Sequence, residues 1–401
     1  MYQIIKKKKE MKKQLRNVFA LALLTTAFVS CSSDDNSNNG GSVKPPTDEV
    51  KINPDDFRGE FIGEKITLDA TKTYRLKGKL IIGKGSELII PAGTKIIGEG
   101  GTSAYIAVAQ EGKIFVNGTK EAPVVMTGVE AKRGNWGGLV ICGKAPINKG
   151  TTATAEVSDL TYGGTDANDN SGSIQYLRIE YAGAAYNSEK EFNGLSFFGV
   201  GSGTKVEYVQ THEGSDDGFE WFGGTVNTKY LVSTHNDDDQ FDWTEGWTGS
   251  NEYWFAKEAA IGNRGIEADN NSSNRSATPI ANPTLKNITL IGLGLNTSDE
   301  LTETQAMKLR EGTKGIIDNV VLVNWKTGFD VDHDETIANV LDGSLKVTNV
   351  RFENVTTKAK GKNTAKESVD VSNLFTEKAD ASGAGNGAET PEWAKGWTVG
   401  L

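Results

Sequence analysis

The chain has 401 residues, a formal net charge of −10 at pH 7 and a hydrophobic content of 37%. This length allows one large domain or two ordinary ones, and the hydrophobic content excludes a largely disordered chain. The two cysteines exclude a disulfide framework, and 47 glycines against nine prolines indicate a fold rich in tight turns.

Residues 1–30 have the organisation of a lipoprotein signal peptide. Basic side chains up to Arg16 precede the apolar stretch VFALALLTTAFV at 18–29, which is too short to span a bilayer comfortably. The following AFVSC at 27–31 resembles a lipobox, in which Cys31 is lipidated and becomes the mature N-terminus. The alternative is an ordinary secretory signal followed by a chance cysteine.

Residues 31–50 are polar, rich in Gly, Ser and Asn, and contain Pro45-Pro46, so we expect a flexible tether. Ser33-Asp34-Asp35 resembles the surface-export signal of Bacteroidota lipoproteins, which implies an outer-membrane location facing the exterior. The first 30 residues hold seven basic side chains and one acidic one. The mature chain is therefore more acidic than the whole, and it should repel nucleic acid and touch the membrane through the lipid anchor only.

Short runs with strand character recur between about 60 and 360. Examples are KLII at 79–82, ELII at 87–90 and KIFV at 113–116. Gly, Asn or Pro separates them, and the spacing is too short for intervening helices. A parallel sheet with crossover helices is therefore not expected.

A longer repeat runs through the centre of the chain. GLSFFGVGSGT (194–204), GFEWFGGT (218–225), QFDWTEGWT (240–248) and MKLREGT (307–313) share an apolar–variable–apolar triplet, a turn and a Ser or Thr. Further copies begin at GIEAD (265–269) and GFDVD (328–332). Periods of 20–30 residues made of strands and turns predict an all-β, single-stranded right-handed parallel β-helix; the alternative is a β-sandwich, which the near-constant repeat disfavours.

The repeat divides the mature chain into N-terminal coils at 51–170, central coils with an acidic face at 171–356, and a tail at 357–401. We expect the tail to be loosely ordered over 357–390, with Trp393 and Trp397 tying the end back as a cap on the last coil. Residues 270–282 and 294–304 read as projecting loops, which commonly form a binding face.

Stacked coils predict three rows of side chains, because each coil lies about 4.8 Å from the next. One inward row is Phe219, Phe241, Ile266, Met307 and Phe329, and the other is Trp221, Trp243, Ala268, Leu309 and Val331. The outward row between them is Ser196, Glu220, Asp242, Glu267, Lys308 and Asp330.

Several segments resemble a Bacteroidota-type family of secreted parallel β-helix lipoproteins. These are ELIIPAGTKIIGEG, NWGGLVICGKAPIN, DDGFEWFGGTVNTKYLV, DDDQFDWTEGW and the C-terminal WAKGWTVGL. Members are often labelled "multidrug transporter", but no 18-residue apolar run outside the signal supports that label. The resemblance implies the β-helix fold. Genes of this family often lie beside genes for TonB-dependent outer-membrane receptors, which implies such a receptor as partner.

The acidic face allows three interpretations: a solvated surface without a ligand, a cation site, or a catalytic site. For a cation, Ca²⁺ fits best, because carboxylates are hard oxygen ligands and no Cys/His cluster is evident, although neither an EF-hand loop nor a calcium repeat occurs. The candidate ligands are Asp216, Asp217, Glu220, Asp237, Asp238, Asp239, Asp242, Glu267 and Asp269.

For catalysis, the candidates are Asp217, Asp242, Lys308 and Arg310. Paired carboxylates hydrolyse glycosides, and β-helix lyases use a basic residue with Ca²⁺. The resemblance to pectinase-type glycosidases is partial: they pair Asp-Asp with Gly-His-Gly and Arg-x-Lys. Here Asp-Asp is present, Lys308-Leu309-Arg310 is reversed, and Gly-His-Gly is absent.

Three histidines and one tryptophan complete the candidates. Thr211-His212 returns as Thr234-His235, 23 residues later, so the two histidines are expected at equivalent, stacked places that close turns. A zinc site would need further ligands, and the spacing offers none. Trp247 lies in a Gly-flanked turn, as a packed residue or as a platform for a sugar.

The leading hypothesis is therefore a non-enzymatic binding or accessory lipoprotein that serves a TonB-dependent receptor in nutrient uptake. Its ligand is a glycan or a small molecule, with Ca²⁺ on the acidic face. The alternatives are a polysaccharide lyase or glycoside hydrolase of the β-helix type, and an adhesin.

Overall fold

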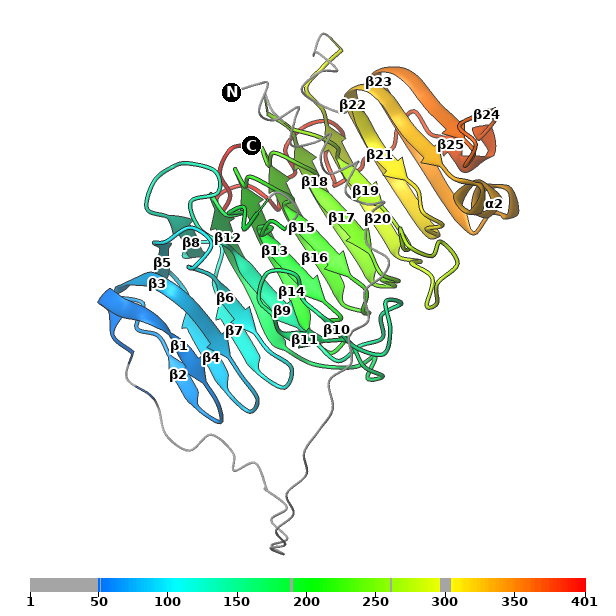
Figure 1. Cartoon of the computed structure of the whole chain (residues 1–401). Coiled ribbons are helices and arrows are strands. Elements are labelled where there is room, and N and C mark those ends of the chain that lie inside the picture. The colour runs from blue at the N-terminus through cyan, green and yellow to red at the C-terminus, as the bar shows by residue number, and fades with distance from the viewer. Residues whose placement is uncertain (1–49, 51, 188–189, 260–261, 296–303) are drawn as a thin grey trace, which may run out of the picture.

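The computed structural model describes residues 50, 52–187, 190–259, 262–295 and 304–401. These residues form a parallel β-helix, in which nearly every strand belongs to one continuous, 23-stranded sheet that winds along the molecule (Figure 1). The expected signal peptide, Cys31 and most of the expected tether lie outside the described residues. The N-terminal and central coils are one solenoid, because β12 pairs with β7 and β8 before it and with β14 after it.

Three series of parallel pairings build the coils. The first series is β2 (Lys65–Thr67), β4 (Glu87–Pro91), β7 (Lys113–Asn117), β12 (Gly172–Glu180), β14 (Lys205–His212), β16 (Asn227–Thr234), β18 (Ser250–Lys257), β20 (Thr284–Ile291), β22 (Gly315–Asp332), β23 (Leu345–Lys362) and β25 (Phe375–Glu377). The second is β1 (Phe57–Phe61), β3 (Thr73–Ile82), β6 (Ile106–Val108), β9 (Leu139–Cys142), β13 (Leu195–Phe198), β15 (Phe219–Phe222), β17 (Phe241–Thr244), β19 (Ile266–Ala268) and β21 (Gln305–Leu309), which ends on β22. The third joins β3, β5 (Lys95–Gly98) and β8 (Val124–Gly128) to β12.

The remaining elements decorate this solenoid. β10 (Ala153–Thr154) and β11 (Thr161–Tyr162) form a separate antiparallel hairpin, and β24 (Ser368–Val369) pairs antiparallel with β23. The helical elements are η1 (Pro54–Asp56), α2 (Asp334–Asp342) and η2 (Ser372–Leu374). Within the described part of the chain, none of the helices has the length and apolar character to cross a bilayer.

Two successive central coils repeat with an offset of 22 residues in register. Phe219, Glu220 and Trp221 pair with Phe241, Asp242 and Trp243, which confirms the predicted rows. The same 22-residue register runs through β14 and β16, where His212 pairs with Thr234. The prediction that His212 and His235 are equivalent is therefore wrong by one residue, because the 23-residue sequence match does not follow the backbone pairing.

Stacked aromatic rings fill the centre of the solenoid. Phe219 and Phe241 are fully buried with ring centroids 5.6 Å apart, and Trp221 and Trp254 stack at 5.0 Å. The inward positions follow the two predicted rows, because alternate residues of a strand point to the same side of the sheet. Burial of these rings supplies much of the hydrophobic free energy of the fold.

A second aromatic stack marks a bend inside the first series of strands. Tyr176, Tyr208, Tyr230 and Tyr253 occupy the same place in successive coils, and their φ values lie between 49° and 61°. Residues other than glycine seldom adopt this left-handed region. Ring stacking at 4.4 Å between Tyr176 and Tyr208, and again between Tyr208 and Tyr230, offsets the strain.

The C-terminal segment differs from the expected loose tail. Residues 357–362 extend β23, because Thr357, Ala359 and Lys360 pair in register with β22. The last residues run back along the solenoid (Figure 1) instead of capping the final coil. Trp397 is buried beside Val232, and the Gln210 side chain bonds both the N–H and the carbonyl oxygen of Val399. The tie to the body was predicted, but its place on the central coils was not.

Replacing Phe241 by alanine should lower the free energy of unfolding by about 3–5 kcal/mol, because the ring is completely buried between two stacked neighbours. Urea denaturation measures this loss. Ile316→Ala, at a strand position that is 42% exposed, is the control and should change stability by about 0.5 kcal/mol or less. Equal losses in both variants would contradict the stacked core.

Candidate functional site

The predicted outward row exists, but it is not a solvated surface. Ser196, Glu220, Asp242, Glu267, Lys308 and Asp330 pair in succession across β13, β15, β17, β19, β21 and β22. Glu267 is 8% exposed and Asp330 is 4% exposed, while Glu220 and Asp242 are partly buried. The interpretation of this row as a freely solvated acidic flank is therefore wrong.

An insertion that the repeat pattern did not reveal helps to bury this region. The segment between β9 and β12 carries the β10–β11 hairpin and packs Val157 and Tyr162 against Phe198 and Phe222. These two phenylalanines stack at 4.0 Å at the ends of β13 and β15, the strands that carry Ser196 and Glu220. The insertion therefore covers the end of the strands next to the acidic row.

The C-terminal half of the row is neutralised by cations. Lys308 follows Glu267 in the row, Asp330 comes next, and Lys360 pairs with Asp330 on the following coil. Lys308 Nζ lies 3.1 Å from Asp330 Oδ2, and Lys360 Nζ lies 3.2 Å from the same oxygen. Arg310 holds Glu267 at 2.6 Å. Charges of opposite sign thus alternate along this half.

A cluster without such ion pairs lies at the N-terminal half of the row. It is here called the carboxylate triad, and consists of Glu220 and Asp242 from the row and Asp217 from the adjoining corner. Each offers an oxygen within 4.8 Å of the other two. Asn193 Nδ2 donates to Glu220 at 2.6 Å, and the backbone N–H of Asp239 donates to Asp217 at 2.9 Å. None of the ion pairs recorded among the described residues includes a member of the triad.

A second carboxylate group adjoins the triad and shares Asp242 with it. Oxygens of Asp239, Asp242 and Glu267 again lie within 4.8 Å of one another. Arg264 bridges Asp239 at 3.2 Å and Glu267 at 2.7 Å. The Oδ1 atoms of Asp239 and Asp242 are buried without a hydrogen-bond partner, so this group is only partly satisfied.

Burial strongly perturbs these acids. It raises the pKa of Asp217, Glu220 and Asp242 well above their usual range, and the neighbouring carboxylates raise the pKa of each further. Burial also raises the pKa of Asp239, although Arg264 opposes it. Burial alone would raise the pKa of Glu267 too, but Arg264 and Arg310 together lower it. Each acid of the triad therefore takes up a proton more readily than an ordinary carboxyl group, although Arg310 opposes this shift at Asp242.

The remaining predicted calcium ligands fall into two groups. Asp216 and Asp238 lie at the corner beside Asp217, with oxygens within 4.8 Å. Asp237 and Asp269 are instead held by arginines: Arg133 contacts Asp237 at 2.8 Å, and Arg310 contacts Asp269 at 2.8 Å. Burial raises the pKa of Asp237 to about 7 and that of Asp269 to about 6, with the arginines opposing the shift.

The four candidate catalytic residues also fall into two groups, two acids of the triad and two ion-paired basic residues. Asp217 and Asp242 belong to the triad. Lys308 is 8% exposed and lies between Asp330 and Asp332, and Arg310 is bound by Glu267 and Asp269. A basic residue engaged by two carboxylates is poorly suited to remove a proton from a substrate.

The sugar-stacking interpretation of Trp247 is wrong. Its side chain is fully buried, stacks on Trp221 at 4.7 Å and donates from Nε1 to the Val226 carbonyl oxygen at 3.2 Å. The neighbouring glycines turn the chain inward, so the ring fills the core. The alternative of a packed turn residue, which the sequence also allowed, is confirmed.

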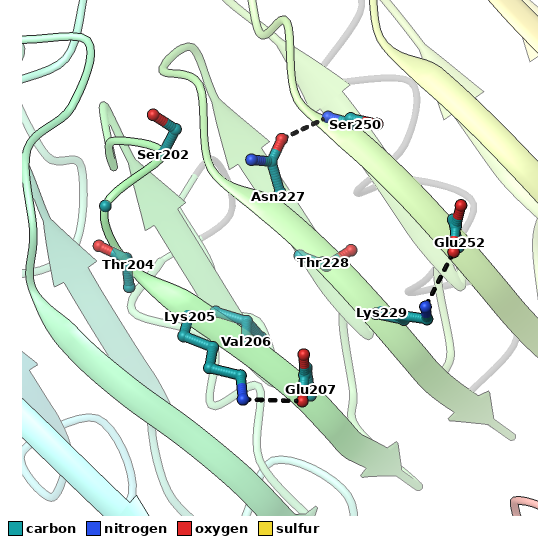
Figure 2. Close-up of a pocket in the computed structure, with 11 residues that line it drawn as sticks. Ser202, Thr204, Lys205, Val206, Glu207, Asn227, Thr228, Lys229, Ser250 and Glu252 are labelled. Atoms are coloured by element: carbon teal, nitrogen blue, oxygen red, sulfur yellow. Dashed lines mark hydrogen bonds and ion pairs between the residues drawn. The ribbon is translucent and has the colours of Figure 1, made fainter.

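A shallow groove of about 380 Å³ lies elsewhere, along the beginnings of β14, β16 and β18 (Figure 2). Ion pairs line it: Lys205 contacts Glu207 at 3.1 Å, and Lys229 contacts Glu252 at 3.0 Å. The sequence analysis missed this groove, because its residues come from the surface ends of three coils and form no motif.

The whole solenoid matches one known family. The model of the pectate-lyase-like β-helix domain aligns with residues 59–398, and the chain belongs to this family. A search of curated proteins found no match. Among solved structures, the chain is similar to the crystal structure of the Agl-KA catalytic domain, with 13% identity, a TM-score of 0.29, and coverage of 79% of this chain and 61% of that one.

The stability of the metal-free protein should fall as pH rises, because the triad carries raised pKa values in the folded state. Above the ordinary carboxyl pKa, the folded chain then holds more protons than the unfolded chain. For each extra proton, the free energy of unfolding falls by up to about 1.4 kcal/mol per pH unit until the pH reaches the raised pKa of the folded state. We therefore expect the variant Glu220→Gln/Asp242→Asn to gain stability relative to the wild-type protein between pH 5 and pH 8 in a chelator.

Urea titrations of both proteins at each pH test this expectation. The comparison cancels the contribution of His212 and His235, whose pKa values are lowered by burial and act in the opposite direction. A constant difference in stability across this pH range would show that the two acids are ionised in the metal-free fold.

Proposed function

We propose that the protein is a non-enzymatic binding or accessory lipoprotein of the outer membrane, with a Ca²⁺ ion held at the carboxylate triad. The observation that carries this proposal is the cluster of Asp217, Glu220 and Asp242, whose oxygens approach within 4.8 Å without a direct ion pair among the described residues. Like charges this close are costly when buried, so the triad requires protons or a cation. At neutral pH a divalent cation relieves the repulsion of all three acids at once.

Calcium suits the donors that surround the triad. Ca²⁺ takes six to eight oxygen ligands in a flexible geometry, from carboxylates, carbonyl groups and water. The triad offers carboxylates only, and Asp216 and Asp238 add two more at the adjacent corner. Glu267 and Asp269 are less suited than the sequence suggested, because arginines already neutralise them. The proposed site is thus narrower than the nine acids first considered.

A catalytic role is the second candidate. The family description and the closeness of Asp217 to Asp242 favour it, since paired acids on a β-helix can cleave glycosidic bonds. However, Lys308 and Arg310 are both engaged by carboxylates. The triad oxygens lie too close for an inverting pair, and although their separation suits a retaining pair, the pKa values of all three acids are raised alike, so none is set apart as the ionised nucleophile. The arrangement therefore favours cation binding over acid–base chemistry.

The proposed location rests on the N-terminal sequence, and the proposed partner rests on the family resemblance. The lipobox-like AFVSC at 27–31 supports lipidation of Cys31, and the following Ser-Asp-Asp supports export to the outer face. The family resemblance supports a TonB-dependent receptor as partner, with the solenoid presenting a glycan or small molecule to it. The polar groove of Figure 2 offers ion-paired side chains for such a contact.

Glu220→Gln and Asp242→Asn should each weaken Ca²⁺ binding about tenfold or more, because each removes a charged ligand from the triad. Isothermal titration of the metal-free protein with CaCl₂ measures the affinity. Asp330→Asn is the matched control: it removes a carboxylate from the same row where Lys308 and Lys360 neutralise it. Unchanged affinity in both triad variants, or an equal loss in Asp330→Asn, would contradict the site.

A pull-down of the tagged lipoprotein from gently solubilised native outer membranes tests the accessory role. We expect a TonB-dependent receptor to be retained in stoichiometric amount, identified by mass spectrometry. The variant Cys31→Ala, without the lipid anchor, is the control for co-solubilised membrane proteins. Recovery of the lipoprotein alone would favour a free-standing enzyme or an adhesin.

A further inference from the structure

A second cluster of metal-ligating side chains lies at another corner of the solenoid. His212 ends β14, Glu213 follows it, and His235 follows the end of β16. A ring nitrogen of each histidine and a carboxylate oxygen of Glu213 lie within 4.8 Å of one another. The cluster contains none of the triad residues.

The backbone fixes two of these residues at the same corner of successive coils. The N–H of Glu213 donates to the Thr234 carbonyl oxygen at 3.0 Å, and the N–H of His235 donates to the Lys257 carbonyl oxygen at 2.9 Å. Both residues adopt left-handed φ values, 51° for Glu213 and 61° for His235. Such values are uncommon for side chains other than glycine, and they recur at functional sites.

His212 is oriented by a buried hydrogen-bond network. Its Nδ1 lies 2.8 Å from Thr234 Oγ1, which also accepts from Gln210 Nε2 at 3.0 Å. A histidine that binds a metal commonly uses its other ring nitrogen to bond a neighbour, which fixes the ring and the tautomer. With Nδ1 engaged by Thr234, the inferred metal ligand of His212 is Nε2, and Gly400 of the C-terminal segment packs beside the same ring.

Burial is the main influence on the pKa values of the two imidazoles of the cluster. Burial lowers the pKa of His212 and lowers that of His235 to about 4, with Arg133 adding to both effects. Arg133 is itself held by the His235 carbonyl oxygen and by Asp237. Neutral imidazoles are the form that binds metals at pH 7.

We propose that His212, Glu213 and His235 bind one Zn²⁺ ion through two imidazole nitrogens and one carboxylate oxygen, with a further position left for water or a ligand. Two histidines and one glutamate with an open fourth position are an established donor set for zinc. Imidazole suits Zn²⁺, whereas the oxygen-only triad suits Ca²⁺. The two sites should therefore select different cations.

The test uses the fact that the full chain has three histidines. Two belong to the cluster, and His333 lies elsewhere, with its Nδ1 accepting from the N–H of Glu311 at 3.2 Å. We expect one equivalent of ZnCl₂ to shift the imidazole ¹⁵N resonances of His212 and His235 and to leave those of His333 unchanged. Excess CaCl₂ should not reverse the shifts.

Calorimetric titration with ZnCl₂ supplies the second measurement. His235→Ala and Glu213→Gln should each weaken zinc binding by about tenfold or more, because each removes one ligand. His333→Gln is the matched control and should bind zinc as the wild-type protein does. Thermal melts without metal verify that the variants fold, and both changed residues are only partly buried.

The proposal would be overturned by the absence of a zinc-dependent shift, by a shift of His333 alone, or by zinc affinity that is unaltered in both ligand variants. Displacement of zinc by calcium would place the ion at the carboxylate triad instead, and would also contradict the proposal. If the wild-type protein binds zinc but not calcium, the zinc inference stands and only the proposed calcium site is overturned.

Discussion

In-register hydrogen bonding between successive coils is the constraint on which the rest of the structure depends. Once Phe219 pairs with Phe241, each residue beside it must stack on the residue 22 positions later. Neighbouring parallel strands lie about 4.8 Å apart, so any property of one position is repeated at that spacing. Apolar positions become a continuous core of stacked rings, and acidic positions become a row of like charges that the backbone cannot separate.

The two halves of the row differ in whether neighbouring cations relieve this repulsion. Beyond Glu267 the row alternates in sign, so that Lys308 and Lys360 share Asp330. Before Glu267 no lysine enters the row, and Glu220 stacks directly on Asp242. A sheet gains no packing or hydrogen bonding from such a pair, and partial burial makes it more costly. The pair therefore supports the proposed cation site, where a bound ion would offset the repulsion.

Much of the fold could be predicted from the sequence, because the triplets Phe-Glu-Trp and Phe-Asp-Trp reveal both the period and the inward and outward positions. Burial of the acidic row could not, because it depends partly on Val157 and Tyr162 of an insertion that does not repeat. The histidine corner was misplaced for a different reason. Sequence identity aligned His212 with His235, whereas backbone pairing aligns it with Thr234, and this one-residue shift brings Glu213 beside both rings.

The same constraint explains why neither candidate cation site resembles a known loop motif. In an EF-hand, one loop supplies most of the ligands, and their spacing in the sequence is diagnostic. In a solenoid, each coil supplies only one or two donors, and the stacking of coils brings them together. Asp217 and Asp242 are 25 residues apart, and Glu213 and His235 are 22 apart, yet each pair shares a cluster. Metal sites in such folds are therefore found by comparing equivalent and neighbouring positions in successive coils.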